Sequence, residues 1–137
     1  MISILFLAFF VIIFIYCSFN IIKIRKNSKL PLSGTNDPIE LTRWIAAQNN
    51  FNQYSIWFLL MLFVIDFYGD LIWEVLALGV VFAIGRIFHL LSMTKLEKYE
   101  NGQILEMPKY RIWGMKITLL ILFYMIVRIS YIAITLF

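Results

Sequence analysis

Four long apolar runs limit how this chain can fold. Each approaches the roughly 20 residues that cross a bilayer as a helix, and the expected helices are about 2–22, 38–67, 71–93 and 112–137. Because 62% of the residues are hydrophobic and only 15% are charged, a water-soluble fold of this length would expose too much apolar surface. The sequence therefore predicts an all-α, integral membrane four-helix bundle, with residues 1–137 as a single domain.

The composition also excludes several classes of protein. A soluble enzyme, a nucleic-acid-binding module and a disulfide-stapled secreted domain do not fit, and the net charge of +4 does not indicate a nucleic-acid partner. The single cysteine, Cys17, cannot form an internal disulfide, and we expect a small membrane-facing side chain there. The first run has no basic residue before it and no cleavage site, so we expect a retained helix. Without a nucleophile–base pair, phosphate loop or paired carboxylate, most hydrolytic mechanisms are excluded.

Basic residues lie in two of the three expected connections between helices. They are Lys23, Arg25, Lys26, Lys29, Lys95, Lys98, Lys109 and Arg111. The second connection is short, which predicts antiparallel neighbouring helices, and it carries Asp66 and Asp70 with no Lys or Arg. The positive-inside rule then places both long connections in the cytoplasm and both termini outside. The short loops favour a bacterial inner membrane. We expect Asp37 to cap the second helix, with Pro38 in its first turn.

Polar residues recur at membrane depth on the second and third expected helices and at the start of the fourth. They are Arg43, Asn50, Gln53, Tyr54, Arg86, His89 and Arg111. Intervals of three, four and seven residues place the first four on one face of the second helix. Arg86 and His89, three residues apart, likewise share a face. Because polar groups in a bilayer need partners or a function, we predict that these residues meet at a cavity near the cytoplasmic interface. Such a cavity suits a small anionic ligand with peptide-like groups.

Structural interpretations stand beside this hypothesis. Asn and Gln hydrogen-bond transmembrane helices to one another, and an Arg near a helix end extends to the headgroups or pairs with an acid such as Glu40. His89 alone is more often a packing residue, and we expect no metal site, because no second His or Cys stands at ligand spacing. For Arg128 we expect only a pairing with a neighbour. Small residues on the third helix indicate close packing, namely Ala77, Gly79, Ala83 and Gly85.

Three stretches resemble motifs of a membrane family. Residues 43–54 look like Arg-x-x-Arg-Ala-x-x-Asn-x-x-Glu-Tyr, residues 85–89 contain the Arg-x-x-His form of a third-helix motif, and residues 111–118 look like Arg-x-x-Gly-Met-x-x-Thr. The family they resemble is MAPEG, the membrane-associated proteins in eicosanoid and glutathione metabolism, in its bacterial form. The resemblance covers nearly the whole chain.

This resemblance implies a homotrimer with glutathione sites between adjacent subunits. Family members conjugate glutathione to lipophilic electrophiles, reduce lipid hydroperoxides or isomerise a prostaglandin endoperoxide, and one only binds a fatty acid. By the resemblance, Asn50 would bind the tripeptide backbone, Tyr54 would line its site and Arg86 would contact a carboxylate. Arg111 is the implied catalytic residue, because a fixed guanidinium lowers the pKa of a thiol. The implied glutathione-binding residues are Arg43, Asn50, Gln53, Tyr54, Arg86 and His89.

Two departures from the motif leave the ligand open. Gln53 stands where glutathione-binding members have Glu, and Ala46 stands where they have Arg. Each lost charge-assisted bond is worth roughly 1.5–3 kcal/mol. The two losses together imply an affinity for glutathione that is weaker by about a hundredfold or more. Three hypotheses follow. The first is a transferase or peroxidase that uses glutathione or another small thiol. The second is a non-catalytic binder of lipids or fatty acids, and the third is a scaffold whose polar residues only hold a trimer together.

Overall fold

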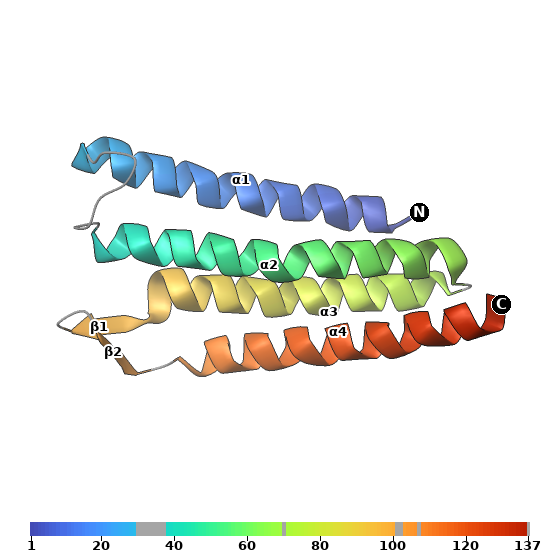
Figure 1. Ribbon diagram of the computed structural model, residues 1–137. Helices are drawn as coiled ribbons and strands as arrows, with labels where there is room; N and C mark the ends of the chain where they lie inside the picture. The colour runs from blue at the N-terminus through green and yellow to red at the C-terminus, as the bar shows by residue number, and fades with distance from the viewer. Residues whose placement is uncertain (30–37, 70, 101–102, 107, 137) are drawn as a thin grey trace.

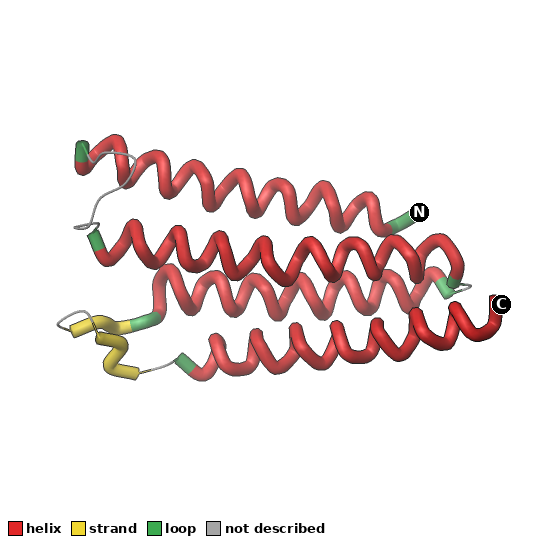
Figure 2. Tube along the Cα trace, viewed as in Figure 1, coloured by secondary structure: helices red, strands yellow, loops and turns green. Residues whose placement is uncertain are grey.

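The computed structural model describes residues 1–29, 38–69, 71–100, 103–106 and 108–136. These residues form four long helices, a π-helical turn and a two-stranded hairpin. In chain order the elements are α1 (Ser3–Ser28), α2 (Ile39–Tyr68), α3 (Ile72–Leu91), η1 (Ser92–Leu96), β1 (Lys98–Glu100), β2 (Gln103–Glu106) and α4 (Lys109–Leu136). Figures 1 and 2 show the helices lying side by side, with both termini at one end of the bundle and the hairpin at the other.

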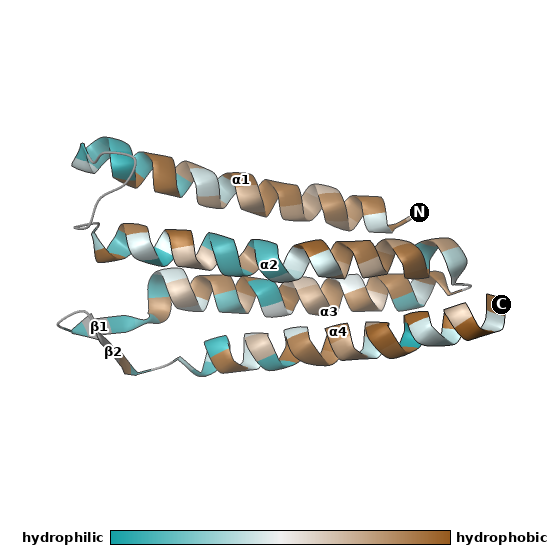
Figure 3. Ribbon diagram, viewed as in Figure 1, coloured by the Kyte–Doolittle hydropathy of each residue, from teal (hydrophilic) through white to brown (hydrophobic). Residues whose placement is uncertain are grey.

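All four helices are long and apolar enough to cross a membrane. Large apolar side chains remain exposed on each of them, for example Leu5, Trp57, Trp73 and Leu120, which suits contact with lipid. Figure 3 shows apolar residues along most of every helix and polar residues in the half of α2 and α3 nearest the hairpin. The predicted all-α membrane four-helix bundle is therefore confirmed.

Aromatic rings from three helices form the centre of the core. Phe58 of α2 and Phe82 of α3 stack with their centroids 3.7 Å apart, and Phe10 of α1 meets both edge-on at 6.0 and 5.8 Å. Leu62 and Met125, from α2 and α4, are fully buried in the same cluster. Edge-on and stacked ring pairs add to the energy of apolar burial, so this cluster fixes how the helices face one another.

Two glycines of α3 let neighbouring helices approach closely. A Cβ atom on Gly79 would lie 2.1 Å from the ring of Phe6 in α1. The second is Gly85, which faces Gly114 of α4 where the two helices cross. A Cβ on Gly114 would lie 2.7 Å from the carbonyl oxygen of Gly85. Small residues permit such backbone contact between transmembrane helices, which agrees with the close packing expected for α3. The crossing with α4 also sets the distance between Arg86 and the first turn of α4.

Hydrogen bonds and an ion pair join the helices at the end of the bundle where the termini lie. Asp66 of α2 accepts hydrogen bonds from the backbone N–H and the hydroxyl of Ser3, at 2.8 and 2.7 Å, and so caps the start of α1. Arg128 of α4 pairs with Glu74 of α3 at 2.9 Å, and Tyr124 donates to the same carboxylate at 2.7 Å. The pairing expected for Arg128 is confirmed, with Glu74 as its partner.

Two helix boundaries and one connection differ from the sequence prediction. Helix α1 continues beyond residue 22 to Ser28, because Lys and Arg are good helix formers and are favourable at a helix C-terminus; Lys29 ends it with a left-handed φ of 50°. Helix α4 begins at Lys109, before the predicted residue 112. The polar stretch before α4, where no strand is predicted, contains the antiparallel hairpin of β1 and β2.

Cys17 also differs from expectation. Instead of facing the membrane it is completely buried, in a cluster with Trp44, Ala47, Leu90 and Met93. Its small side chain fits where α1 crosses α2, a position that an unbroken apolar run does not reveal. The predicted cap at Asp37 and the turn residue Asp70 lie outside the described residues.

Candidate functional site

Arg86 lies at the centre of the predicted polar group. Its side chain projects from α3 and is 1% exposed, and its Nη2 donates a hydrogen bond to Asn50 Oδ1 of α2 at 2.7 Å. The guanidinium carbon lies 5.2 Å from the ring centroid of Tyr54 and 5.9 Å from that of Phe51. These distances suit cation–π interactions. Three of the predicted site residues, Asn50, Tyr54 and Arg86, therefore meet inside one chain.

The buried guanidinium keeps unused hydrogen-bonding capacity. Its Nη1 lies 4.0 Å from the sulfur of Met115, which is a weak acceptor, and its Nε is buried without a hydrogen-bond partner among the described residues. A buried donor on a cation is costly to leave unpaired. The environment of Arg86 therefore suits an additional acceptor, such as the carboxylate or amide carbonyl of a peptide.

His89 lies one turn after Arg86, where α3 meets the start of α4. It is 2% exposed, and a Cβ atom on Gly114 would lie 3.0 Å from His89 Cβ. Both Arg86 and Arg111 are close enough to His89 to interact with it electrostatically. The group of basic side chains therefore continues from α3 to the first turn of α4.

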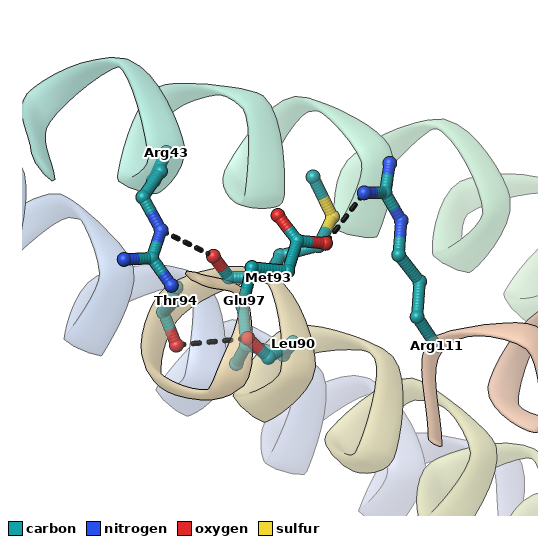
Figure 4. Close-up of polar contacts among 6 residues, drawn as sticks. All are labelled: Arg43, Leu90, Met93, Thr94, Glu97 and Arg111. Carbon is teal, nitrogen blue, oxygen red and sulfur yellow. Dashed lines mark hydrogen bonds and ion pairs between the residues drawn. The ribbon is translucent and has the colours of Figure 1, made fainter. Parts of the chain in front are cut away.

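Arg111 pairs with an acid that the sequence analysis did not single out. Its Nη1 donates to Glu97 Oε1, and the Glu97 side chain is 1% exposed whereas that of Arg111 is 24% exposed. Glu97 follows η1, and its backbone N–H donates to the carbonyl of Ser92 at 3.1 Å. Figure 4 shows the Glu97 carboxylate directed toward Arg111. In the sequence Glu97 is one charge within a polar stretch, without periodicity, so nothing there marked it as buried.

Arg43 and Gln53 do not join the Arg86 group in the same way. Arg43 Nε donates to the Met93 carbonyl of η1 at 2.8 Å, so this side chain braces the π-helical turn (Figure 4). Gln53 is exposed on α2, and so is Ala46. The sequence analysis considered Glu40 as a partner of Arg43 or Arg86. In the structure Arg43 bonds to the Met93 carbonyl, and Arg86 bonds to Asn50.

The comparison with family models matches residues 3–131 to the MAPEG family. This match covers nearly the whole chain. The protein belongs to the MAPEG family. Neither the curated proteins nor the solved structures gave a match. Membership supports, in general terms, a glutathione-related transferase or peroxidase function at a membrane.

The structure places the three MAPEG-like stretches at one end of the bundle. Residues 43–54 lie in α2, residues 85–89 in α3 and residues 111–118 in α4, and each contributes to the contacts around Arg86 and His89 or to those of Arg111. Among the described residues, no group of three or more His, Cys, Asp or Glu side chains is arranged to hold a metal ion. The described residues of this site therefore supply fixed cations, a buried carboxylate, an amide and aromatic rings.

Proposed function

We propose that this MAPEG protein is a membrane-embedded, glutathione-dependent transferase or peroxidase that acts on lipophilic electrophiles. The observation that carries the proposal is Arg86, a buried cation that is bonded to Asn50 and keeps an unpaired Nε among the described residues. A tripeptide with two carboxylates supplies the acceptors that this guanidinium lacks. The proposal includes one domain over residues 1–137, a homotrimer, a bacterial inner membrane, cytoplasmic long loops and both termini outside.

In this proposal the chain binds a thiol rather than supplying a nucleophile of its own. Arg86 and Asn50 hold a carboxylate and an amide of glutathione, Tyr54 lines the site, and His89 lies beside Arg86. Arg111 favours the thiolate, because a nearby cation lowers a thiol pKa and raises the reactive fraction at neutral pH. The electrophile reaches the sulfur from the bilayer, where lipophilic compounds concentrate.

The exposure of Gln53 supports a site shared between subunits. Gln53 and Ala46 lie on the outer surface of α2 in one chain, although both fall within the stretch that aligns with the glutathione motif. In a homotrimer this surface would face a second copy, and Gln53 would then line the same site as Arg86. Arg43 would act from the cytoplasmic end by holding η1 in place through Met93.

Glutathione binding to the detergent-purified protein tests this proposal. We expect saturable binding and a thiolate ultraviolet absorbance that appears at lower pH than for free glutathione. Arg111→Ala should return that absorbance toward the pH of the free thiol. Lys116→Ala is the matched control, because it removes an exposed cation of α4 that lies 5.5 Å from the Trp113 ring. No binding at millimolar glutathione by an intact oligomer would refute the proposal.

A groove favours a second candidate function, a non-catalytic binder of lipids or fatty acids. It lies between α1 and α2, has a volume of about 390 Å³ and is lined almost entirely by apolar side chains, among them Leu7, Ile56, Leu60 and Phe63. Its volume and apolar lining suit an acyl chain. Native mass spectrometry that found a bound lipid, not displaced by thiols, would support this candidate over the enzyme.

A further inference from the structure

Glu97 carries a buried carboxylate close to the implied catalytic residue. The residue is 4% exposed, and the hydrogen bond from its backbone N–H to Ser92 fixes the chain at the end of the π-helical turn. Turns of this kind are frequent at functional sites. Since a buried charge is costly unless it is paired, a carboxylate at this position needs the cation that the structure places beside it.

The contact with Arg111 leaves part of that cation accessible. Arginine has five N–H donors, and the bond to Glu97 is made by Nη1. The Arg111 side chain is 24% exposed, against 1% for that of Glu97. An incoming anion can therefore reach Arg111 while Glu97 remains bound to it.

Among the described residues, the ionisable groups that α2, α3 and η1 place beside this pair are basic. Arg43 of α2 approaches from the far side and bonds to the Met93 carbonyl (Figure 4). His89 of α3 interacts electrostatically with Arg111, and Lys95 of η1 is exposed. Glu97 is thus a negative charge beside the cationic side chains of Arg43, Lys95 and Arg111, and it opposes the attraction that these cations exert on an anion.

We propose that Glu97 is a positioning residue that acts through Arg111. Its carboxylate holds the guanidinium in place and, as a fixed negative charge, weakens the attraction of Arg111 for an incoming anion. That the physiological anion is the glutathione thiolate rests on the proposed function. Glu97 then sets how far the bound thiol pKa is lowered, and so how much thiolate is present at neutral pH.

Glu97→Gln tests the role of the charge. The amide keeps the size of the side chain and an oxygen that accepts from Arg111, but it removes the negative charge. We expect the pH midpoint for thiolate formation by bound glutathione to fall by about one unit, a tenfold change in the thiolate-to-thiol ratio. Glu100→Gln, which removes an exposed carboxylate of β1, should leave the midpoint unchanged. An unchanged midpoint in Glu97→Gln would overturn the proposal.

Two further variants separate positioning from folding. Glu97→Ala removes both the charge and the hydrogen bond. We therefore expect its kcat to fall with little change in the KM for glutathione. Glu97→Gln keeps the hydrogen bond and should have most of the wild-type kcat. Should Glu97→Gln not fold, Glu97→Asp replaces it. The shorter side chain draws the carboxylate away from Arg111, and the midpoint should fall by less than one unit. A midpoint equal to that of the wild type would contradict the proposal.

A probe other than glutathione separates this proposal from the proposed function. Decanesulfonate in non-ionic detergent is a permanent monoanion with an alkyl chain. We expect Glu97→Gln to bind it about tenfold more tightly than the wild type does, and a variant that also carries Arg111→Gln to show no gain. If the wild type binds no glutathione but this difference is found, the proposed function fails and the role of Glu97 stands. Equal decanesulfonate affinities would refute the role of Glu97.

Discussion

Arg86 of α3 donates a hydrogen bond of 2.7 Å to the side-chain oxygen of Asn50 in α2. This bond links two helices through a charge that is 1% exposed, next to the ring of Tyr54 at 5.2 Å. A cation in an apolar interior needs acceptors and aromatic faces around it. In the proposed function, the same features that make the cation tolerable inside the bundle also suit it to hold an anionic ligand.

Asn50→Ala should weaken both the fold and ligand binding. It leaves a buried donor of Arg86 without its acceptor, which costs about 1–3 kcal/mol in the free energy of unfolding. Asn49→Ala removes the same amide from an exposed neighbouring position, and we expect a change within about 0.5 kcal/mol. Denaturation in mixed micelles measures the stability of both variants. Equal stabilities would mean that the Asn50–Arg86 bond contributes nothing net to the fold.

Much of the fold was predictable because the bilayer imposes lengths and polarities that can be counted. Four apolar runs gave the four helices, and the short intervals between Asn50 and Tyr54 on one helix, and between Arg86 and His89 on the next, predicted a meeting of α2 and α3. The boundaries were less predictable, since Lys and Arg continue α1 beyond its apolar part without breaking the helix. Cys17 was placed wrongly because apolar residues on the lipid face and in the core have the same composition.

The partners of the charged residues were the least predictable part of the site. Glu97 and Arg111 are separated by the β1–β2 hairpin, and only the folded chain shows that they meet. The sequence also put Arg43 in one group with Asn50, because they share a helix face. In the structure Arg43 bonds to the Met93 carbonyl instead, a backbone acceptor that side-chain periodicity cannot reveal.

Gly114→Ala should disturb the crossing of α3 and α4. The added Cβ would lie 2.7 Å from the Gly85 carbonyl oxygen, a backbone atom that cannot move without shifting a helix. We expect a loss of about 1–3 kcal/mol in stability, as for overpacked cores, and weaker glutathione binding because Arg111 moves with α4. Gly85→Ala is the graded control, since its Cβ would meet the Ile117 side chain at 3.1 Å and the Gly114 carbonyl oxygen at 3.4 Å, both wider than the 2.7 Å contact of Gly114→Ala. A larger loss for Gly85→Ala than for Gly114→Ala would contradict this packing account.

Glu74→Gln should destabilise the opposite end of the bundle. Arg128 would lose its ionic partner, and Tyr124 would donate to a neutral amide instead of a carboxylate. Because the side chains of Arg128 and Glu74 are 20% and 10% exposed, we expect a loss of about 1–2 kcal/mol, less than for a fully buried pair. Glu40→Gln at an exposed site of α2 is the control. Glutathione binding should survive in Glu74→Gln, and a specific loss of binding would place this ion pair in the ligand site.

Gln53→Glu should strengthen glutathione binding. Glutathione-binding members of the family have a carboxylate at this position, and it would pair with the ammonium group of the ligand in a charge-assisted bond worth about 1.5–3 kcal/mol. A gain of about tenfold in affinity corresponds to 1.4 kcal/mol, and adding Ala46→Arg should increase it further. Asn49→Asp places the same charge on an exposed neighbouring position of α2 and should have no effect on binding. Equilibrium titration measures all three variants. If Gln53→Glu gained no affinity, glutathione would not lie against this face of α2, and the lipid-binding candidate would gain support.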